Sequence, residues 1–378
     1  CRLSRLPPCH AMNAVSHPSP LPAQPDFLPA GCESVGPSRL DQLVKAVAQR
    51  APKVVAVVLA AGQSSRMGSN KLLADVGGLP MLRRTVMAIA PAADRVIVVT
   101  GATSGLGRAA AEQFDRDGAT VIAVGRNADK TATAVGVLRE ATGNPNISAV
   151  IADMGDYHSV RRAATEILAE HDRLDVLIHN AGALTHQRID APDSTEATIA
   201  SQVVGPFLLT SLLLERLEAS APARVITMSS GGMYTAELTA DRLEMDADSY
   251  NGSKQYALAK RAQVTLNEMW ADRVDRRSVV FHSMHPGWAD TPGVQEALPM
   301  FRKIVGPLLR DAEGGADTMV WLAADDGESL ATTGGFWLDR RIRAIHRLPN
   351  TRRSDTPERR QELWDWVTER AGLLPTEM

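Results

Sequence analysis

The stretch Asp94–Arg108, D-R-V-I-V-V-T-G-A-T-S-G-L-G-R, restricts the fold more than any other part of the chain. It opens with the apolar, β-branched run Val96–Val99, which is typical of a strand buried on both faces. Three glycines follow at Gly101, Gly105 and Gly107, and a helical pattern begins directly after them. Such a turn lets the backbone approach a pyrophosphate, and free N–H groups at the helix start point toward it. The stretch therefore predicts a nucleotide-binding strand–turn–helix unit.

Strand and helix patterns alternate regularly over the rest of the chain. The predicted strands are 119–124, 147–152, 174–179, 223–229, 278–284 and 335–338, and the predicted helices are 105–117, 128–141, 158–170, 194–219, 253–272 and 311–324. This alternation favours a parallel sheet with helices on both faces and ligands at the carboxyl ends of the strands. We expect an α/β fold with a Rossmann-type, doubly wound parallel sheet over residues 95–345, followed by a docking helix in the tail 346–378.

Composition argues against several classes of function. The chain has 378 residues, of which 44% are hydrophobic and 22% charged, as in ordinary soluble globular proteins. A net charge of −3 gives no sign of nucleic-acid binding, and we find neither an apolar run of membrane-spanning length nor a secretory leader. The cysteines lie at Cys1, Cys9 and Cys32, so the later chain has no thiolate metal site or disulfide framework. We expect a cytoplasmic protein without metal, membrane or nucleic acid.

The N-terminal part does not follow this alternation. Residues 1–50 are rich in proline, serine and alanine without a helix or strand period, and we expect them to be mostly disordered. Residues 51–94 include L-A-A-G-Q-S-S-R-M-G-S-N-K-L-L at 59–73, where two glycines would let amides cradle phosphates beside Arg66 and Lys71. This run resembles the nucleotidyltransferases that load CTP or GTP onto molybdopterin. We interpret it as a truncated half-domain, with transferase activity as an alternative function.

Four motifs in the later chain resemble those of the short-chain dehydrogenases/reductases. They are T-G-A-T-S-G-L-G at Thr100–Gly107, N-A-G at Asn180–Gly182, Y-A-L-A-K at Tyr256–Lys260, and Pro286–Gly287 followed by Thr291. Further segments at 229–234, 284–294 and 334–341 are similar to the subgroup that includes dehydrogenase/reductase SDR family member twelve. The resemblance covers residues 95–345 and implies an oxidoreductase that interconverts carbonyls and alcohols with a nicotinamide dinucleotide.

Tyr256 and Lys260 stand four residues apart on a predicted helix, so their side chains share one face. A tyrosine that exchanges protons near neutral pH needs its pKa lowered from about 10 to about 7, which costs roughly 4 kcal/mol. One ammonium about 4 Å away supplies roughly that much at an effective dielectric of about 20. We interpret Tyr256 as the proton donor to a carbonyl and as the base toward an alcohol. Lys260 would supply the ammonium and, by resemblance, bind the nicotinamide ribose.

Tyr250 and Lys254 form a second Y-x-x-x-K six residues earlier. Gly252 weakens a helix there, and Tyr250 lies in the approach to the helix. The amphipathic pattern continues after Lys260, as it does in the family after the catalytic lysine. We therefore assign the catalytic role to Tyr256, with a solvated Tyr–Lys pair as the structural alternative.

Two further residues complete the predicted catalytic group. Ser229 and Ser230 end a strand pattern and would aim a hydroxyl at the substrate oxygen, and Ser230 matches the family position better. Gln202 stands where the family often has an asparagine that supports a water, which relays protons to the lysine. Glutamine carries the same amide one carbon further out, so the sequence does not decide whether Gln202 supports this relay.

The segment after the second strand distinguishes NAD from NADP. An NAD enzyme places an acid there for the ribose 2′-hydroxyl, whereas Val124–Asn127 has no acid and carries the guanidinium of Arg126, which suits a 2′-phosphate. NADP(H) is therefore favoured over NAD(H). The predicted cofactor-binding residues are Thr100, Gly101, Thr103, Ser104, Gly105, Leu106, Gly107, Arg126, Asn127, Asp153, Met154, Asn180, Ala181, Gly182, Tyr256, Lys260, Pro286, Gly287 and Thr291.

The substrate is not encoded in any pattern that we recognise. Loops 184–192, 233–249 and 292–308 are expected to line its pocket, and the expected partner is a small carbonyl or alcohol compound. The family usually pairs through its long helices, so a homo-oligomer is compatible with the sequence. Because Gln202 departs from the family pattern, a nucleotide-binding scaffold without turnover is a second alternative function.

Overall fold

A computed structural model describes residues 75–76, 79–80, 95–289 and 309–373 of the chain. Two short strands, β1 (Asp75–Val76) and β2 (Leu79–Pro80), pair with each other in antiparallel fashion. The predictions for the N-terminal tail, for Arg66 and Lys71, and for Thr291 lie outside the described residues. The remaining description concerns 95–289 and 309–373.

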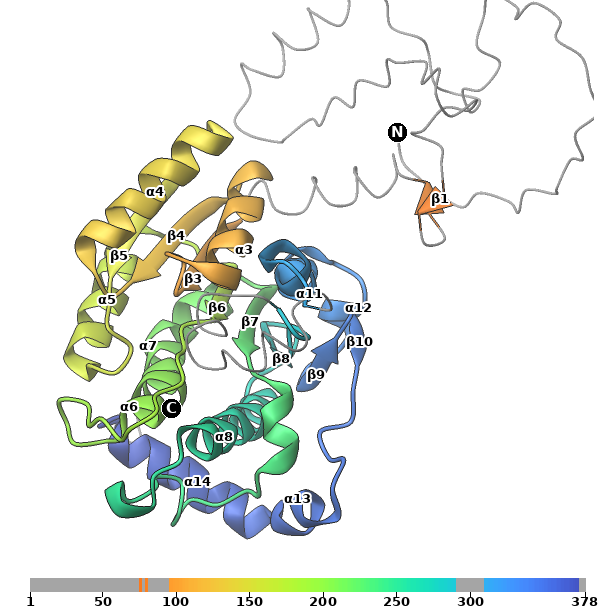
Figure 1. Ribbon diagram of the computed structural model, residues 1–378. Coiled ribbons are helices and arrows are strands. Elements are labelled where there is room, and N and C mark those ends of the chain that lie inside the picture. The colour runs from red at the N-terminus through yellow and green to blue at the C-terminus, as the bar shows by residue number, and fades with distance from the viewer. Residues whose placement is uncertain (1–74, 77–78, 81–94, 290–308, 374–378) are drawn as a thin grey trace, which may run out of the picture. The chain divides into compact units, whose positions relative to one another are not determined.

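An eight-stranded sheet forms the centre of this part of the chain (Figure 1). Its strands are β3 (Val96–Thr100), β4 (Thr120–Gly125), β5 (Ile147–Ile151), β6 (Val176–His179), β7 (Ala223–Met228), β8 (Val279–Met284), β9 (Gly335–Leu338) and β10 (Arg341–Ile342). Their spatial order is β10-β9-β8-β7-β6-β3-β4-β5, and all pairings are parallel except that of β10 with β9. This confirms the predicted doubly wound parallel sheet.

The direction of winding reverses at β3. The chain moves outward from β3 through β4 to β5, and then β6 returns to the other side of β3, where Ile97 is in register with Val176. In open α/β sheets the crevice at such a reversal, outside the carboxyl ends of the strands, is where ligands bind. The ends of β3 and β6 at Thr100 and His179 therefore mark the expected ligand crevice.

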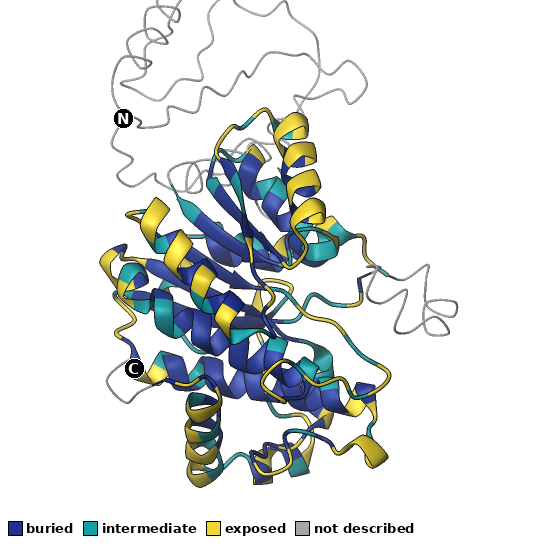
Figure 2. Cartoon of the chain, turned by 90° about the vertical axis from the view of Figure 1, so that its left-hand side faces the viewer, coloured by how far each residue is buried: buried dark blue, intermediate teal, exposed yellow. Residues whose placement is uncertain are grey.

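Helices cover both faces of the sheet. On one face lie α3 (Gly105–Arg116), α4 (Ala128–Thr142) and α11 (Ala312–Ala324); on the other lie α5 (Tyr157–Glu170), α7 (Gly205–Ala219) and α8 (Gly252–Arg273). Figure 2 shows the strands buried between helices whose outer sides are exposed. This double cover explains why the central strands are rich in buried Val, Ile, Leu and Ala.

The predicted helix 194–219 has a more complex start than expected. Ser194 has a φ of 70°, and the chain enters the helix only after Glu196, whose side chain accepts a hydrogen bond from the Ile199 amide at 3.0 Å. Here α6 (Ala197–Ile199), a π-helical turn η2 (Ala200–Val204) and α7 run without a break.

This continuous helix corrects one expectation from the sequence. Ala197–Ala219 is long and apolar enough, by length and composition, to span a membrane, although the sequence analysis found no such run. In this fold 72% of the apolar window is buried, as expected for a core helix packed between the sheet and its neighbours. Length and composition therefore give only weak support for a span.

Several short elements were not predicted. They are η3 (Gly231–Thr235), η4 (Ala247–Ser249), α12 (Glu328–Ala331) and α13 (Pro349–Ser354). The helix α14 (Pro357–Arg370) follows them and lies against α8, where Trp364 packs edge-on to Trp270 with ring centroids 4.9 Å apart (Figure 1). Leu363 and Val367 are fully buried beside it. The C-terminal helix thus closes the outer side of α8.

Candidate functional site

The glycine turn after β3 has the conformation of a phosphate cradle. Gly101 and Gly105 have φ values of 68° and 54°, which favour glycine because a side chain is strained there. The helix α3 starts at Gly105, and its N-cap residue Ser104 makes no side-chain hydrogen bond to the first-turn amides. No acidic residue stands in the first turn of α3. These amides are therefore available to an anion, and the helix dipole favours one.

Gly107 is required for a different reason. A Cβ atom at this position would collide with the carbonyl oxygen of Gly101 and with the side-chain amide of Asn180. The bare backbone of Gly107 lets α3 lie directly against the turn. The Leu106 side chain lies against α11, where the missing Cβ of Gly315 leaves room for it. The glycines are thus placed by close contacts as well as by φ.

Asn180 and Ala181 brace the turn from the end of β6. The Asn180 side-chain amide donates to the Thr100 carbonyl oxygen at 3.1 Å, and the Asn180 and Ala181 backbone amides donate to the Thr100 hydroxyl at 3.0 and 3.1 Å. That hydroxyl in turn donates to the Ile178 carbonyl oxygen at 3.2 Å. In the structure, Asn180 and Thr100 therefore fix the two strand ends at the winding reversal.

Arg126 and Asn127 follow β4 at the same edge of the sheet. Arg126 is exposed, and it forms no hydrogen bond or ion pair within the described residues. Asn127 caps α4, where its side chain accepts a hydrogen bond from the Lys130 amide at 2.9 Å. Asn127 therefore has a structural role, whereas the guanidinium of Arg126 is free for an anionic ligand.

Asp153 and Met154 follow β5 and differ in exposure. The exposed Asp153 carboxylate accepts a hydrogen bond from the Gly155 amide at 2.9 Å, which forms a local turn. Met154 is 4% exposed and belongs to the core cluster of α5, α7 and α8. Its backbone carbonyl lies so close to Gly205 that no side chain fits there. The side chain of Met154 is thus packed in the core.

Tyr256 and Lys260 lie on one face of α8, beyond the end of β7. The Lys260 ammonium lies 5.0 Å from the centroid of the Tyr256 ring and donates to the Met228 carbonyl oxygen at 2.8 Å. Burial lowers the pKa of Lys260 to about 7. Burial raises the pKa of Tyr256 to about 12, although a hydrogen bond with Ser230 acts in the opposite direction. At neutral pH, Tyr256 therefore carries a proton that it can donate.

The two serines after β7 face in different directions. Ser229 is buried, and its hydroxyl donates to the Lys260 carbonyl oxygen at 3.0 Å. The Ser230 hydroxyl lies within hydrogen-bonding reach of Tyr256 and also accepts from the Gly232 amide at 3.3 Å, where it caps η3. Ser230 therefore lies beside the tyrosine hydroxyl, while Ser229 holds the helix against the strand.

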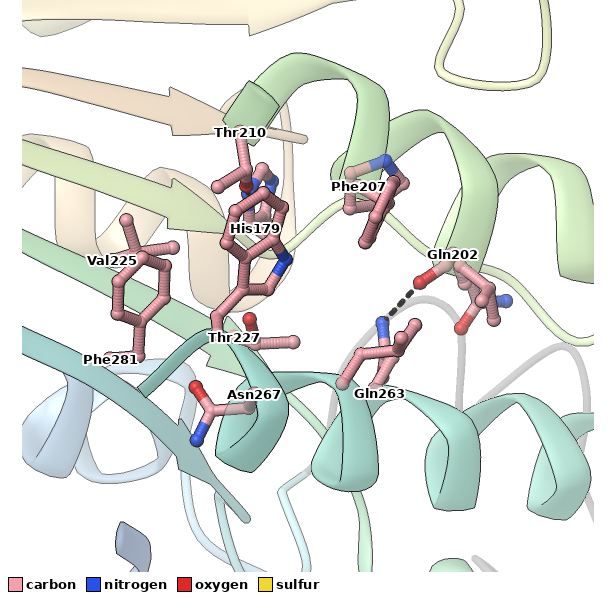
Figure 3. A pocket seen from close by; sticks show the side chains of 13 residues that line it. His179, Gln202, Phe207, Thr210, Val225, Thr227, Gln263, Asn267 and Phe281 are labelled. Atoms are coloured by element: carbon pink, nitrogen blue, oxygen red, sulfur yellow. Dashed lines mark hydrogen bonds between the residues drawn. The ribbon is translucent and has the colours of Figure 1, made fainter. Parts of the chain in front are cut away.

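Gln202 lies in the π-helical turn and touches Lys260 only through another residue. The Gln202 side chain donates to the Ala183 carbonyl oxygen at 2.6 Å. Its backbone oxygen accepts from the side chain of Gln263 at 2.6 Å (Figure 3). The other end of the Gln263 amide accepts from Lys260 at 3.0 Å. The sequence analysis missed Gln263, although its place three residues after Lys260 puts it on the same helix face.

The second tyrosine motif has a different environment. The Tyr250 hydroxyl is hydrogen-bonded to Thr185 at 2.6 Å and donates to the Glu196 carboxylate at 2.9 Å. Lys254 is exposed in the first turn of α8. At Gly252 a Cβ would collide with the Thr185 carbonyl oxygen, so the helix start needs glycine here. Tyr250 ties the helix start to the neighbouring loop.

The segment after β8 closes the described part of the site. Gly287 follows Pro286 with a φ of 75°, and a Cβ there would contact the Arg310 guanidinium. The His285 ring lies against Gly231, and burial lowers its pKa to about 4, so it is neutral at physiological pH. The predicted residue Thr291 lies outside the described residues.

The loop 233–249 lines the site less than expected. The side chains of Ala236, Leu238, Ala240, Leu243 and Met245 all pack into the core cluster. Gln255 on α8 anchors this segment, since its amide binds the Met245 nitrogen and the Leu243 oxygen, each at 2.8 Å. Within the described residues no group of three or more His, Cys, Asp or Glu side chains is arranged to bind a metal ion.

A small cavity lies behind this site. It measures about 30 Å³ and lies between β6, β7, α7 and α8 (Figure 3). Its polar lining residues are His179, Gln202, Thr210, Thr227, Gln263 and Asn267. Among the described residues, both amide atoms of the buried Asn267 side chain and the Nδ1 atom of His179 lack a hydrogen-bond partner. Most of the surface that lines the cavity is apolar, but these polar atoms could serve a water molecule as partners.

Comparison with known proteins gives consistent results. The sequence profile of the short chain dehydrogenases matches residues 95–300. Human Dehydrogenase/reductase SDR family member 12 is 38% identical over 269 residues, which cover 71% of this chain and 84% of the human protein. Human Retinol dehydrogenase 13 is 30% identical over 254 residues, covering 65% of this chain and 76% of that protein. The first similarity confirms the subgroup indicated by the sequence segments.

Solved structures also resemble this chain. A protein of Escherichia coli CFT073, described as a short chain dehydrogenase and solved in complex with NADPH, has a TM-score of 0.52 and 28% identity. The match covers 65% of this chain and 95% of that protein. A protein from Mycobacterium paratuberculosis has a TM-score of 0.59 and 25% identity, and covers 74% of this chain. Both similarities support the α/β fold.

Proposed function

The chain belongs to the short-chain dehydrogenase family, and from this premise we propose that it is an NADP(H)-dependent oxidoreductase that interconverts a small carbonyl compound and an alcohol. The observation that carries the proposal is the meeting of Ser230, Tyr256 and Lys260 beyond the carboxyl end of β7, in the same sheet whose strand β3 ends in the glycine turn. Tyr256 and Lys260 come from one helix, α8, whereas Ser230 follows β7, and the fold brings it beside Tyr256.

The residues at the turn fit a dinucleotide. The uncapped start of α3 would hold the pyrophosphate, because its first amides have no side-chain cap among the described residues, whereas the Gly101 amide already donates to the Val124 carbonyl oxygen at 2.9 Å. The guanidinium of Arg126, which has no partner among the described residues, would hold a 2′-phosphate, and the segment Val124–Asn127 has no acid to favour a ribose hydroxyl. Asp153 would approach the adenine. When bound, NADPH supplies the hydride for carbonyl reduction.

The chain's own side chains handle the proton. Tyr256 is protonated at neutral pH and would donate its phenolic proton to the oxygen of a carbonyl. Ser230 would hold that oxygen, since its hydroxyl already lies beside the tyrosine hydroxyl. The Lys260 ammonium near the ring would stabilise the tyrosinate that remains, and its pKa of about 7 keeps a substantial charged fraction at neutral pH.

Tyr256→Phe is the direct test. Removing the phenolic hydroxyl leaves the ring in place but takes away the proton donor, so we expect turnover to fall at least 10³-fold, by a rough comparison with other general acids. NADPH binding, followed by its fluorescence, should change little. Substrates would come from a panel of aldehydes, ketones and quinones, with consumption of NADPH as the measurement.

Tyr250→Phe is the matched control. It removes a hydroxyl from the other Y-x-x-x-K motif, where that group binds Thr185 and Glu196. It should lower the stability of the loop without abolishing turnover. Full activity in Tyr256→Phe would contradict the catalytic assignment. NADPH binding without turnover of any panel member in the unsubstituted protein would favour a nucleotide-binding scaffold.

A further inference from the structure

We propose that Gln263 is a positioning residue whose side-chain amide joins the catalytic lysine to the backbone of the π-helical turn, in the place where the family resemblance implies a water molecule. The inference rests on the proposed function of Tyr256 and Lys260. It assigns a role to a residue outside the predicted motifs.

Three hydrogen bonds define the link. The Lys260 ammonium donates to the Met228 carbonyl oxygen at 2.8 Å and to the Oε1 atom of Gln263 at 3.0 Å. The Nε2 atom of Gln263 donates to the Gln202 carbonyl oxygen at 2.6 Å (Figure 3). A primary amide carries an acceptor and a donor at its two ends, as a bridging water does. Gln263 therefore satisfies both neighbours without solvent.

The link does not depend on the side chain at position 202. The Gln202 side chain is engaged with the Ala183 carbonyl oxygen at 2.6 Å, and only its backbone oxygen faces Gln263. Every residue type has that oxygen. Position 202 holds a glutamine where the family often has an asparagine. Because only the backbone oxygen is used, this difference leaves the connection to Lys260 intact.

An amide bridge fixes the lysine more firmly than a water would. Gln263 is 5% exposed and is carried on the same helix as Lys260, so its position is set by the fold. An ammonium has three N–H donors, and Met228 and Gln263 accept two of them. One donor remains for the ligand side of the site. The bridge thus sets the direction of that remaining N–H.

The cavity behind Gln263 supplies a way to test the bridge. It measures about 30 Å³ and has unpartnered polar atoms on Asn267 and His179. A short side chain at position 263 would join this space to Lys260 and admit water, since the space is larger than one water requires and the unpartnered atoms of Asn267 and His179 offer that water partners. A leucine would fill the space and admit none. Gln263→Leu should therefore impair catalysis more than Gln263→Ala does, whereas Gln263→Ala should disturb the packing more.

The titratable neighbours of Lys260 make its pKa a usable readout. Tyr256 lies beside Lys260 on α8, β6 ends at His179, and β8 carries His282 and is followed by His285. Burial lowers the pKa values of these histidines to about 3, about 4 and about 4, so all three are neutral near pH 7. Tyr256 is protonated there. A titration near pH 7 therefore reports on Lys260 itself.

The experiment compares Gln263→Leu with Gln263→Ala in the full chain. We expect Gln263→Leu to lower kcat by roughly 10- to 100-fold, as when a charged group loses one hydrogen bond. In the NMR titration of ¹³C-labelled lysine, assigned with Lys260→Arg, the pKa of Lys260 should fall by about one unit, because the charged form loses an acceptor. Gln263→Ala should lose less than roughly fivefold in kcat, because a bridging water is nearly as good as a direct bond.

Gln255→Leu is the matched control on the same helix. Gln255 is also fully buried, and both ends of its amide bind backbone atoms of the loop 233–249. Its replacement should lower the thermal midpoint about as much as Gln263→Leu does, with no change in the pKa of Lys260. This separates the bridge from general damage to the core.

A loss of kcat in Gln263→Ala as large as or larger than that in Gln263→Leu would overturn the proposal. A purely structural glutamine predicts that Gln263→Ala is at least as impaired as Gln263→Leu, because alanine leaves the larger cavity. An unchanged pKa of Lys260 in Gln263→Leu would also refute the bridge. If the unsubstituted chain binds no NADPH and turns over nothing, the proposed function fails, while the lysine titration still decides whether Gln263 holds Lys260.

Discussion

Neighbouring residues in this site have different roles because the backbone turns between them. Ser229 holds the backbone of α8, whereas Ser230, one peptide further, lies beside the Tyr256 hydroxyl. Asn127 caps a helix, whereas Arg126 before it is exposed and unpartnered among the described residues. Such pairs cannot be separated by residue type. The contacts of each side chain decide which one is available to a ligand.

Arg126 should determine the choice between the two dinucleotides. Arg126→Ala removes a guanidinium that would bind the 2′-phosphate, and we expect NADPH to bind roughly 10- to 100-fold more weakly. NADH lacks this phosphate, so its affinity should be unchanged. Fluorescence titrations with both dinucleotides measure the difference. Arg116→Ala is the control, because this exposed arginine pairs with Glu112 at the far end of α3.

Equal weakening of NADPH and NADH in Arg126→Ala would contradict this role. It would indicate that the arginine supports the strand end in general. An effect of the same size in Arg116→Ala would instead point to a long-range charge effect, which falls as salt is added.

At the scale of elements, the unit from β3 to α3 depends on a backbone contact that leaves no space for a side chain. Gly107→Ala would push a Cβ into Gly101 and Asn180, so the turn and the end of β6 would have to separate. We expect loss of NADPH binding and a lower free energy of unfolding, by about 2 kcal/mol or more. Binding titrations and chemical denaturation measure the two effects.

Gly136→Ala is the control for this prediction. Gly136 lies within α4, and a Cβ there would meet nothing within 4 Å. Alanine is the better helix former by roughly 1 kcal/mol, so this variant should be slightly more stable and bind NADPH normally. Normal binding in Gly107→Ala would show that α3 can move away from the turn at little cost.

Element boundaries followed well from the sequence, while contacts between elements did not. The run Val96–Val99 and the helix 128–141 match β3 and α4 within one residue, because apolar periodicity is a local signal. The π-helical turn that carries Gln202 has no such signal. Gln263 was missed because its role depends on Gln202, which only the fold brings close. The core residues of loop 233–249 were likewise hidden by its turn-rich composition.

At the scale of the whole described chain, the C-terminal segment is held to α8 by buried charges. Asp355 pairs with Arg261 at 2.8 Å and with Arg360 at 2.6 Å, and the side chains of Asp355 and Arg261 are 3% and 1% exposed. Burial acts to raise the pKa of Asp355, but the hydrogen bond and charge of Arg360, together with Arg261, outweigh it and lower the pKa. The pair therefore stabilises the fold when Asp355 is ionised.

Asp355→Ala should destabilise the protein strongly. It leaves the buried Arg261 guanidinium without its carboxylate, which typically costs about 3–5 kcal/mol. Denaturant unfolding measures the change. Asp275→Ala is the control, because this exposed residue pairs with Arg277 on the surface, where solvent screens the pair and its loss should hardly change stability. A change below about 1 kcal/mol in Asp355→Ala would contradict the anchoring role.

The same pair has a defined pH dependence. The pKa of Asp355 in the folded chain lies below the unfolded value of about 3.9. The stabilisation that the Asp355–Arg261 pair contributes is therefore fully present above that value. It should be lost as the pH falls through the folded pKa. The difference in stability between the unsubstituted protein and Asp355→Ala should therefore shrink only in acid.

The reversal of winding at β3 also determines when this protein can fold during its synthesis. The first described strand of the sheet is a central one, and its second neighbour, β6, is translated only after two further strand–helix units. Until then the emerging chain has an apolar strand with an open edge, which favours aggregation and slow, non-local closure. We therefore expect the nascent chain to expose this edge of β3 until β6 has been translated.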